Sequence, residues 1–245
     1  MKNIAHKICN LNATDFHMHT SSFSDGLNTL DEIVQFAGKI WYKQICITDH
    51  SDASLDAFKR VWIYGSVARW SLRSYQNLHN DMAVDFGVEW DIIDKEGNTC
   101  FTIQWKDSDF CILSAHSHVY TDNPETITDA TTKAIEKYAD TIKFIAHPTC
   151  NNQFGKYYDL KRLVDVANYW KIPLELNAKS ISRGKSDEKN VKYILEHADE
   201  MYLNSDAHNL ADLQTYRVQT VAILLQRWYI SQEDYDKFIR HFSFV

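Results

Sequence analysis

Short apolar runs alternate with amphipathic segments along most of this chain. Residues Leu30, Ile33, Val34 and Ala37 follow the spacing of one helix face, and Leu160, Leu163, Val164 and Ala167 repeat it. Between such segments lie short runs rich in β-branched and other apolar residues, as expected for buried strands: Gln44–Thr48, Val84–Val88, Phe110–Ser114, Lys143–Ala146, Pro173–Leu176 and Met201–Asn204. This alternation predicts a parallel sheet covered by helices.

Several polar residues predict where the helices begin and where the alternation is interrupted. Thr29 and Glu32 form a capping-box pattern, and Asp187 can cap a later helix. Asp94–Asn98 predicts a turn between two strand-like runs. Ser54–Asn80 is rich in aromatic residues and predicts a longer helical region that lies over one end of the sheet.

The distribution of glycine favours a closed barrel over an open nucleotide-binding sheet. An open sheet of that kind has a glycine-rich phosphate loop after an early strand, and neither GxGxxG nor GxxxxGK[ST] occurs in this chain. The 7 glycines and 3 prolines mark turns and no linker. We therefore expect one domain over residues 1–245, with helices in its C-terminal part, residues 210–245.

Composition narrows the class of protein and its compartment. The formal net charge of −7 argues against long nucleic acid as a partner, since a duplex binder needs basic side chains to displace counterions. No stretch approaches the roughly 18 uninterrupted apolar residues of a membrane span, and the first fifteen residues contain no signal-peptide core. The 5 cysteines form no CxxC pair, which predicts reduced thiols and a cytoplasmic location.

The candidate chemistry lies at the ends of the predicted strands. In a parallel barrel these ends meet at one rim, where active sites are found. Seven of the 11 histidines follow a strand in this way, together with several carboxylates. The residues concerned are His17, His19, His50, Glu89, His116, His118, His147, Glu175, Asp206 and His208.

The types of these residues indicate a metal site. Residues 17 and 19 are two positions apart, so in an extended segment both imidazoles face the same side and can reach one ion. Neutral imidazole and carboxylate together suit Zn, Mn or Fe. A single HxH pair is a short pattern, and the interpretation depends on the other strand ends.

The chain resembles the polymerase and histidinol phosphatase (PHP) superfamily. The stretch DFHMHTSSFSDG (Asp15–Gly26) is similar to the first motif of that family. The other motifs follow in order: ITDHSD, GVEWD, LSAH, IAHP, LELN and NSDAH. The resemblance spans about residues 15 to 210 and implies the distorted (βα)7-type barrel of this family, as a single α/β domain.

The resemblance also implies a site for three divalent metal ions, Zn, Mn or Fe. His17, His19, Glu89 and Asp206 would hold the first ion. Glu89 would bridge to the second, which His116 and His147 would complete, and Asp25, His50 and His208 would hold the third. His118 lies two residues after His116 and could exchange roles with it, although we prefer His116.

Other residues are assigned supporting or catalytic roles by the same resemblance. Glu175 and Asn177 match family positions that orient the ligands, and Arg183 lies in a region where family phosphatases bind phosphate with arginine. Lys156 and Lys179 are weaker phosphate candidates. His118 or Asp52 could protonate the leaving group. The candidate catalytic set is therefore His17, Glu89, Asp206, Arg183 and His118.

The expected activity is hydrolysis of a phosphate monoester on a small metabolite by a metal-bridging hydroxide, with histidinol phosphate as one candidate. The first alternative is a phosphodiesterase or nuclease acting on nucleotides or single strands, because the same family includes such activities. The second is a non-catalytic, metal-stabilised binding module. A metal-dependent amidohydrolase fits less well, because the bridging position holds Glu89 and no lysine.

Overall fold

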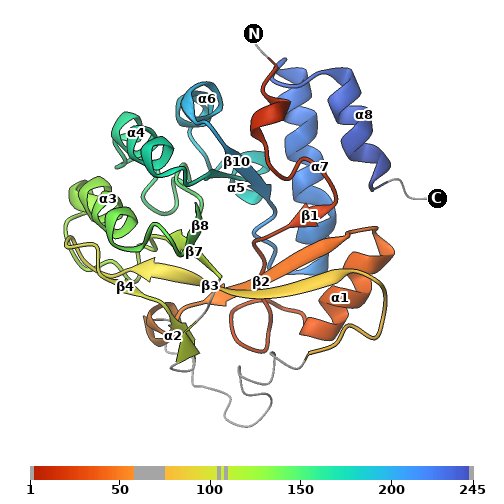
Figure 1. The fold of residues 1–245 in the computed structure, drawn as a ribbon, viewed down its shortest axis with the longest axis horizontal. Helices are drawn as coiled ribbons and strands as arrows, with labels where there is room; N and C mark the ends of the chain where they lie inside the picture. The colour runs from red at the N-terminus through yellow and green to blue at the C-terminus, as the bar shows by residue number, and fades with distance from the viewer. Residues whose placement is uncertain (1–2, 58–74, 104–105, 108–109, 243–245) are drawn as a thin grey trace.

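The computed structural model describes residues 3–57, 75–103, 106–107 and 110–242. Its central feature is a nearly closed barrel of parallel strands, arranged in chain order around the axis (Figure 1). The strands are β1 (Thr14–Asp15), β2 (Gln44–His50), β3 (Ala83–Ile92), β7 (Cys111–Ser114), β8 (Ile142–Ile145), β9 (Leu174–Asn177) and β10 (Met201–Asn204). All six strands predicted from the apolar runs are confirmed, with ends that differ by a few residues.

Strand β3 is the longest, and it extends beyond the barrel rim. There it pairs antiparallel with β4 (Thr99–Cys100), across the turn predicted at Asp94–Asn98. A separate small hairpin joins β5 (Thr102–Ile103) to β6 (Lys106–Asp107). Within the barrel, β3 pairs with β2 on one side and with β7 on the other, so its central residues are fixed from both sides.

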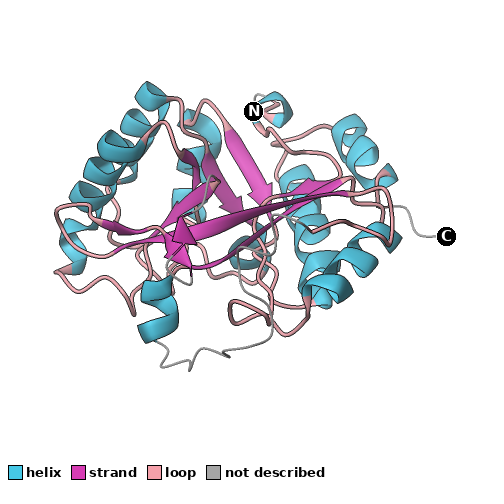
Figure 2. Ribbon diagram, turned by 60° about the horizontal axis from the view of Figure 1, so that its bottom comes forward, coloured by secondary structure: helices cyan, strands magenta, loops and turns pink. Residues whose placement is uncertain are grey.

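Helices pack around the strands (Figure 2). They are α1 (Leu30–Lys39), α2 (Asp52–Ala57), α3 (Ile127–Tyr138), α4 (Leu160–Trp170), α5 (Ala178–Ser182), α6 (Glu188–His197), α7 (Leu210–Gln226) and α8 (Gln232–Arg240), with 3-10 turns at Ala5–Lys7 and Pro124–Thr126. The Thr29–Glu32 capping box is present at α1, and Asp187 caps α6. Among the described residues, no helix combines the length and the apolar character that crossing a membrane requires.

The helix predicted over Ser54–Asn80 is described only in part. Helix α2 is described as far as Ala57, residues 58–74 lie outside the described residues, and residues 75–80 are not helical. The side chain of Asn77 accepts hydrogen bonds from the backbone N–H groups of His79 and Asn80. Such local bonds compete with the helical pattern, which explains why this part of the prediction is wrong.

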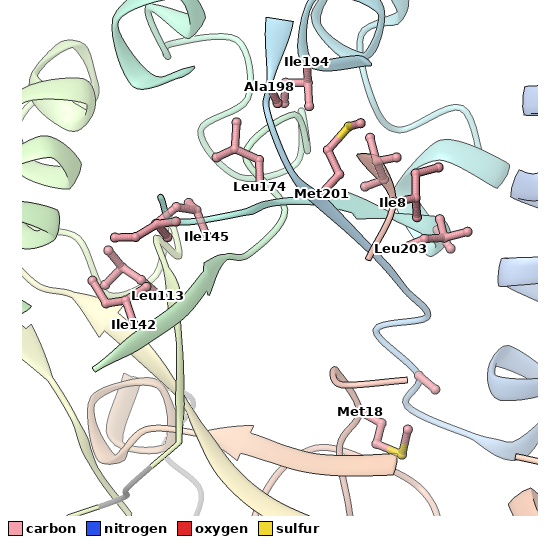
Figure 3. Close-up of a cluster of buried hydrophobic side chains, with 14 of the residues drawn as sticks. Ile8, Met18, Leu113, Ile142, Ile145, Leu174, Ile194, Ala198, Met201 and Leu203 are labelled. Atoms are coloured by element: carbon pink, nitrogen blue, oxygen red, sulfur yellow. The ribbon is translucent and has the colours of Figure 1, made fainter. Parts of the chain in front are cut away.

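The hydrophobic core fills the space between the barrel and its helices. Figure 3 shows Leu113, Ile145 and Leu174 on neighbouring strands, with Ile194 and Ala198 of the α6 region packed close to Met201. These side chains are almost completely buried. Because both faces of the strands are covered, the strands read as continuous apolar runs in the sequence.

A seam between β1 and β10 closes the barrel without a regular ladder. Two isolated parallel bridges, Ile8 with Met201 and Met18 with Ala207, cross it. Between them, the buried side chain of Asn10 donates to the Leu203 carbonyl oxygen at 3.0 Å and accepts from the Leu203 N–H at 2.6 Å. A side-chain amide thus takes the place that a neighbouring strand would occupy.

Candidate metal centre

The predicted strand-end residues converge on one rim of the barrel. His50 is the last residue of β2, Glu89 lies in β3, and His116 follows β7 by two positions. Parallel strands present their carboxyl ends to the same side, and the register pairs His50 with Glu89 directly. The strand ladder therefore determines which side chains become neighbours.

The carboxylate of Glu89 occupies the middle of this rim and is fully buried. Histidine nitrogens surround both of its oxygens. The distances to Oε1 are 2.7 Å for His147 Nε2, 3.5 Å for His17 Nε2 and 3.5 Å for His116 Nε2, and those to Oε2 are 2.8 Å for His50 Nδ1 and 3.6 Å for His19 Nε2. One carboxylate thus faces five imidazoles.

Asp25 and Asp206 extend the cluster on its more open side. Asp25 Oδ1 lies 3.4 Å from His50 Nε2 and 3.2 Å from His208 Nε2. Asp206 Oδ1 lies 3.5 Å from His19 Nε2 and 3.8 Å from His17 Nε2. The structure thereby brings together every residue that the sequence assigned to metal.

Within the described residues, four groups of potential ligand atoms lie mutually within 4.8 Å. Their members overlap, so that the groups form one continuous cluster. They are His17–His19–Asp206, His17–Glu89–His147, His50–Glu89–His116 and His19–Asp25–His50–His208.

The residues fit divalent ions by a geometric test. His17 Nε2 and His19 Nε2 are buried and have no hydrogen-bond partner among the described residues. Their nearest carboxylate oxygens are 3.5–3.8 Å away, which is long for a hydrogen bond. Two ligand atoms about 2.1 Å from one tetrahedral ion are separated by about 3.4 Å. The spacing is therefore that of ligands that share an ion.

Carboxylates behind the histidines fix which ring nitrogen faces the cluster. Glu175 Oε1 lies 2.8 Å from His17 Nδ1, and Asp91 Oδ1 lies 2.6 Å from His116 Nδ1. Each carboxylate can accept the Nδ1 proton, so that the neutral ring presents an unprotonated Nε2 to the cluster, which is the tautomer that a metal requires. The second oxygen of Glu175 accepts the His147 backbone N–H at 2.8 Å.

Sequence reasoning missed the role of Asp91. The motif GVEWD includes it, and it lies two positions after Glu89 on the same strand, so both side chains face the same side. Its pairing with His116 depends on the β3–β7 register, which places Asp91 opposite Ser114. The two-residue spacing was the available signal.

The electrostatics of the cluster also point to cation binding. Burial alone would raise the pKa of the Glu89 carboxyl, but His116, His17 and His50 hold it well below its usual range. Burial would likewise lower the pKa of His17, whereas Glu175, Glu89 and Asp206 raise it well above the ordinary value. Without metal, protons on His17 and His50, whose pKa values the carboxylates raise, therefore help to balance the buried negative charge, whereas burial lowers the pKa of His19.

Two cluster residues adopt left-handed backbone conformations. His147 has φ of 34° and Asp206 has φ of 52°. Non-glycine residues pay an energetic cost in this region, and such residues gather at functional sites. Here the left-handed turn directs each side chain toward the cluster from the end of its strand.

The other predicted site residues lie at different distances from this centre. His118 stacks on His116 with ring centroids 5.1 Å apart, and its Nε2 is 3.0 Å from the Ser54 hydroxyl. Lys179, the weaker phosphate candidate, has its Nζ 2.8 Å from His208 Nδ1. Arg183 is exposed at the end of α5 and lies near the Tyr216 hydroxyl, whose pKa burial and Asp212 raise against the opposing effect of Arg183.

Two more candidates contact residues outside the cluster. The carboxylate of Asp52 accepts a hydrogen bond from the Thr102 hydroxyl at 2.7 Å. The Lys156 ammonium lies over the ring of Tyr157, 4.8 Å from its centroid. Neither residue belongs to the four ligand groups described above.

Comparison with known families identifies the class of this barrel. The family model for the PHP domain matches residues 15–172. The chain belongs to the PHP family. This membership, together with the histidine–carboxylate cluster, makes the PHP chain a metal-dependent phosphoesterase.

Known proteins similar to the PHP chain fall into two kinds. The DNA polymerase/3'-5' exonuclease PolX of Bacillus subtilis is 26% identical over 223 residues, which is 85% of this chain and 36% of the polymerase. The chain thus spans about a third of that relative. A protein named "Probable phosphatase" from Caldicellulosiruptor bescii is 28% identical over 203 residues, 80% of each chain.

A solved structure supports the fold. The histidinol phosphate phosphatase of Lactococcus lactis, crystallised with Zn, L-histidinol and phosphate, superimposes with a TM-score of 0.56 at 14% sequence identity. The match covers 89% of this chain and 94% of that one. The barrel architecture is therefore shared over nearly the whole length of both proteins.

Proposed function

We propose that the PHP chain hydrolyses phosphate monoesters of small metabolites at a centre for three divalent ions. The observation that carries this proposal is the position of Glu89, whose two oxygens face five imidazoles and connect separate groups of ligands. A carboxylate in that position can bridge ions. Both the phosphatase from Caldicellulosiruptor and the histidinol phosphate phosphatase structure support a monoester as substrate.

The proposed ligand sets distribute the members of the four overlapping groups over three ions, in the pattern that the family resemblance implies. His17, His19, Glu89 and Asp206 would hold one ion; Glu89, His116 and His147 would hold the second; Asp25, His50 and His208 would hold the third. When bound, such ions lower the pKa of coordinated water to about 7 and polarise phosphoryl oxygens. We favour His116 over His118 because its Nε2 faces Glu89 at 3.5 Å.

The supporting carboxylates keep the ligand set in register for this chemistry. Glu175 joins two ligand strands, since one oxygen orients the His17 ring and the other holds the His147 backbone. Asp91 orients His116 in the same way. Preorganised ligands need no rearrangement when charge develops on the phosphoryl group.

Basic side chains near the open side would bind the phosphate. Lys179 Nζ lies 3.8 Å from Asp206 Oδ1 and is 24% exposed, so it can reach both the cluster and a ligand in solvent. We propose Lys179 as a phosphate contact, with Arg183 as a second one that approaches from the exposed end of α5.

For His118 we propose a positioning role. Burial, together with the neighbouring His116, lowers the pKa of His118 to about 4, so that its ring is neutral at pH 7. A neutral imidazole stacked on His116 is a poor proton donor, but it restrains the neighbouring ring. The His118→Ala variant should keep its metal and lose only part of its kcat, whereas His116→Ala should lose metal.

The deciding experiment measures metal content and product together. The purified protein is analysed for Zn, Mn and Fe, and then assayed with p-nitrophenyl phosphate and with bis(p-nitrophenyl) phosphate. We expect close to three ions per chain and preferential cleavage of the monoester. The His17→Ala variant should lose metal and turnover, while the control His79→Ala, which removes an exposed histidine paired with Asp31, should change neither.

Other outcomes would contradict particular parts of the proposal. Wild-type turnover in His17→Ala with unchanged metal content would refute the ligand assignment. Bound metal without turnover of either ester would instead indicate a binding module. Preference for the diester would favour the alternative function, phosphodiester hydrolysis. The similarity to the Bacillus polymerase/exonuclease supports that alternative.

A further inference from the structure

A hollow lies at the opposite end of the barrel from the metal centre. It has a volume of about 770 Å³ and lies where α1 ends, β2 begins and α8 ends, with the segment before β3 as its fourth wall. These elements adjoin on the right in Figure 1. Strand β2 separates Gln44 from His50 by six steps, or about 20 Å, so the hollow is distinct from the histidine cluster.

This hollow gathers positive charge. Lys43 and Arg240 line it, and among the described residues neither of them forms an ion pair. Asp81 also lines it, without approaching either cation within 4.0 Å. In a chain whose formal net charge is −7, a local excess of cations with no ion-pair partners attracts anions.

The positive charge of the buried Arg217 adds to the electrostatic potential of the hollow from the protein interior. Its guanidinium carbon lies 5.7 Å from the ring centroid of Tyr42, which lines the hollow, and 5.8 Å from that of Phe242. The neighbouring His241 responds to the same charges, since burial, Lys43 and Arg217 all lower its pKa.

An exposed indole forms one side of the hollow. Trp41 is 62% exposed and adopts a left-handed conformation with φ of 66°. Glycine is the usual residue at this position after a helix, and a tryptophan there is held by the bonds from its N–H to Gly38 and from Tyr42 N–H to Ala37. Trp228 has the same left-handed conformation and a similar exposure after α7, so what distinguishes Trp41 is its position beside Lys43 in the lining of the hollow.

We infer that this hollow binds a compound that carries both a phosphate group and a planar ring, such as a nucleoside monophosphate. Lys43 and Arg240 would contact the phosphate, and the indole of Trp41 would stack on the ring. The volume falls within the range of small-molecule sites. Base stacking on aromatic side chains is a recurrent mode of nucleotide recognition.

The test uses the metal-loaded protein and an AMP analogue with a methylenephosphonate group, which a phosphoesterase cannot cleave. Binding is measured by calorimetry. We expect saturable binding that weakens about tenfold or more in Trp41→Gly and in Lys43→Gln/Arg240→Gln. Adenosine and ribose 5-phosphate, which each lack one of the two groups, should bind more weakly than the analogue.

Two controls separate this site from the metal centre and from net charge. The Lys189→Gln/Lys192→Gln variant removes the same charge from exposed positions on α6, which lies far from α1 in Figure 1, and should bind normally. The His17→Ala variant should also keep this binding. The inference is overturned if the analogue does not bind at millimolar concentration, or if binding is lost in His17→Ala and retained in Lys43→Gln/Arg240→Gln.

The unfolding temperature of the Trp41→Gly variant is a second measurement, which distinguishes a lost ligand contact from misfolding. Glycine adopts a left-handed conformation without strain, so this variant should unfold at the same or a higher temperature than the wild type. Weaker binding together with retained thermal stability would be the signature of a ligand-contacting residue. Unchanged affinity in that variant would exclude the stacking role.

Discussion

The carboxylate of Asp91 connects the side chains of His116 and Ser51. Its Oδ1 lies 2.6 Å from His116 Nδ1, and its Oδ2 accepts a hydrogen bond from the Ser51 hydroxyl at 2.5 Å. All three groups are buried. Asp91 thus orients the His116 ring, and its own position is fixed by Ser51, the residue that follows β2.

Replacing Asp91 with asparagine should therefore weaken metal binding without removing a proposed ligand. Asparagine keeps the shape but lacks the charge that fixes the His116 tautomer, and losses of such partners cost about 10- to 100-fold in metal affinity or activity. Metal titration and kcat of Asp91→Asn should show this loss. The Asp85→Asn variant, on the exposed part of the same strand, should behave like the wild type; equal behaviour of the two variants would contradict the role of Asp91.

The stabilising effect of metal should increase as the pH rises. In the metal-free protein the pKa of His17 is raised by Glu175, Glu89 and Asp206 against the opposing effect of burial. A raised histidine pKa contributes stability that is fully present below the unfolded pKa of about 6.5 and is lost as pH rises through the folded value. The metal-free protein should therefore lose stability above about pH 6.5.

Melting curves with and without Zn or Mn across pH 6 to 9 would measure this effect. The metal-bound protein needs no protons on these histidines, so the difference in Tm should widen with pH. A difference in Tm that is constant or narrows over this range would contradict the proposed balance between protons and ions.

Arg217 should be a major contributor to stability. It is 1% exposed, and its guanidinium donates to the carbonyl oxygens of Leu203 at 2.9 Å, Asn10 at 2.6 Å and Asn12 at 3.1 Å. Replacing it with leucine removes the charge-assisted donor from these buried acceptors, although Asn10 still donates to the Leu203 oxygen, and should cost about 3–5 kcal/mol in the free energy of unfolding. Urea denaturation of Arg217→Leu would measure this, with exposed Arg227→Leu as the control, expected to change stability by less than about 1 kcal/mol.

Gly26 should be required for the ion that Asp25 is proposed to hold. A Cβ at this position would lie 2.2 Å from the His19 carbonyl oxygen, a backbone atom that cannot move without displacing His19. Gly26→Ala should therefore lose at least one ion per chain. Gly184→Asn is the comparison, since nothing lies within 4 Å of a Cβ there and asparagine tolerates its φ of 64°. Full metal content in Gly26→Ala would show that the loop can adapt.

The sequence predicted the site residues whose placement depends on their position along a strand. The strand ends predicted from the apolar runs placed His50, Glu89 and His116 on one rim, and the structure brings them together. Local patterns sufficed because the pleat of a strand and the common direction of parallel strands fix where each side chain points.

Such patterns could not predict contacts that depend on three-dimensional packing. Lys179 lies in the first turn of α5, directly after β9, and approaches His208, which follows β10. Arg217 looks like a surface residue of a long helix, yet it is buried where α7 crosses the seam. Periodicity reports the average burial of a helix face and does not identify which single charged residue lies beneath it.

The way the barrel closes has a consequence for how it opens. At the seam, two isolated bridges and the side chains of Asn10 and Arg217 hold β10 to the N-terminal segment, whereas the β2–β3 pair is joined by a ladder of seven consecutive residues. In hydrogen exchange, the amide protons of Cys9 and Leu203 should therefore be replaced by deuterium earlier than those of Ile47 and Val88. The first opening event of this barrel would then be the release of its N-terminal segment, which carries His17 and His19 away from the other ligands.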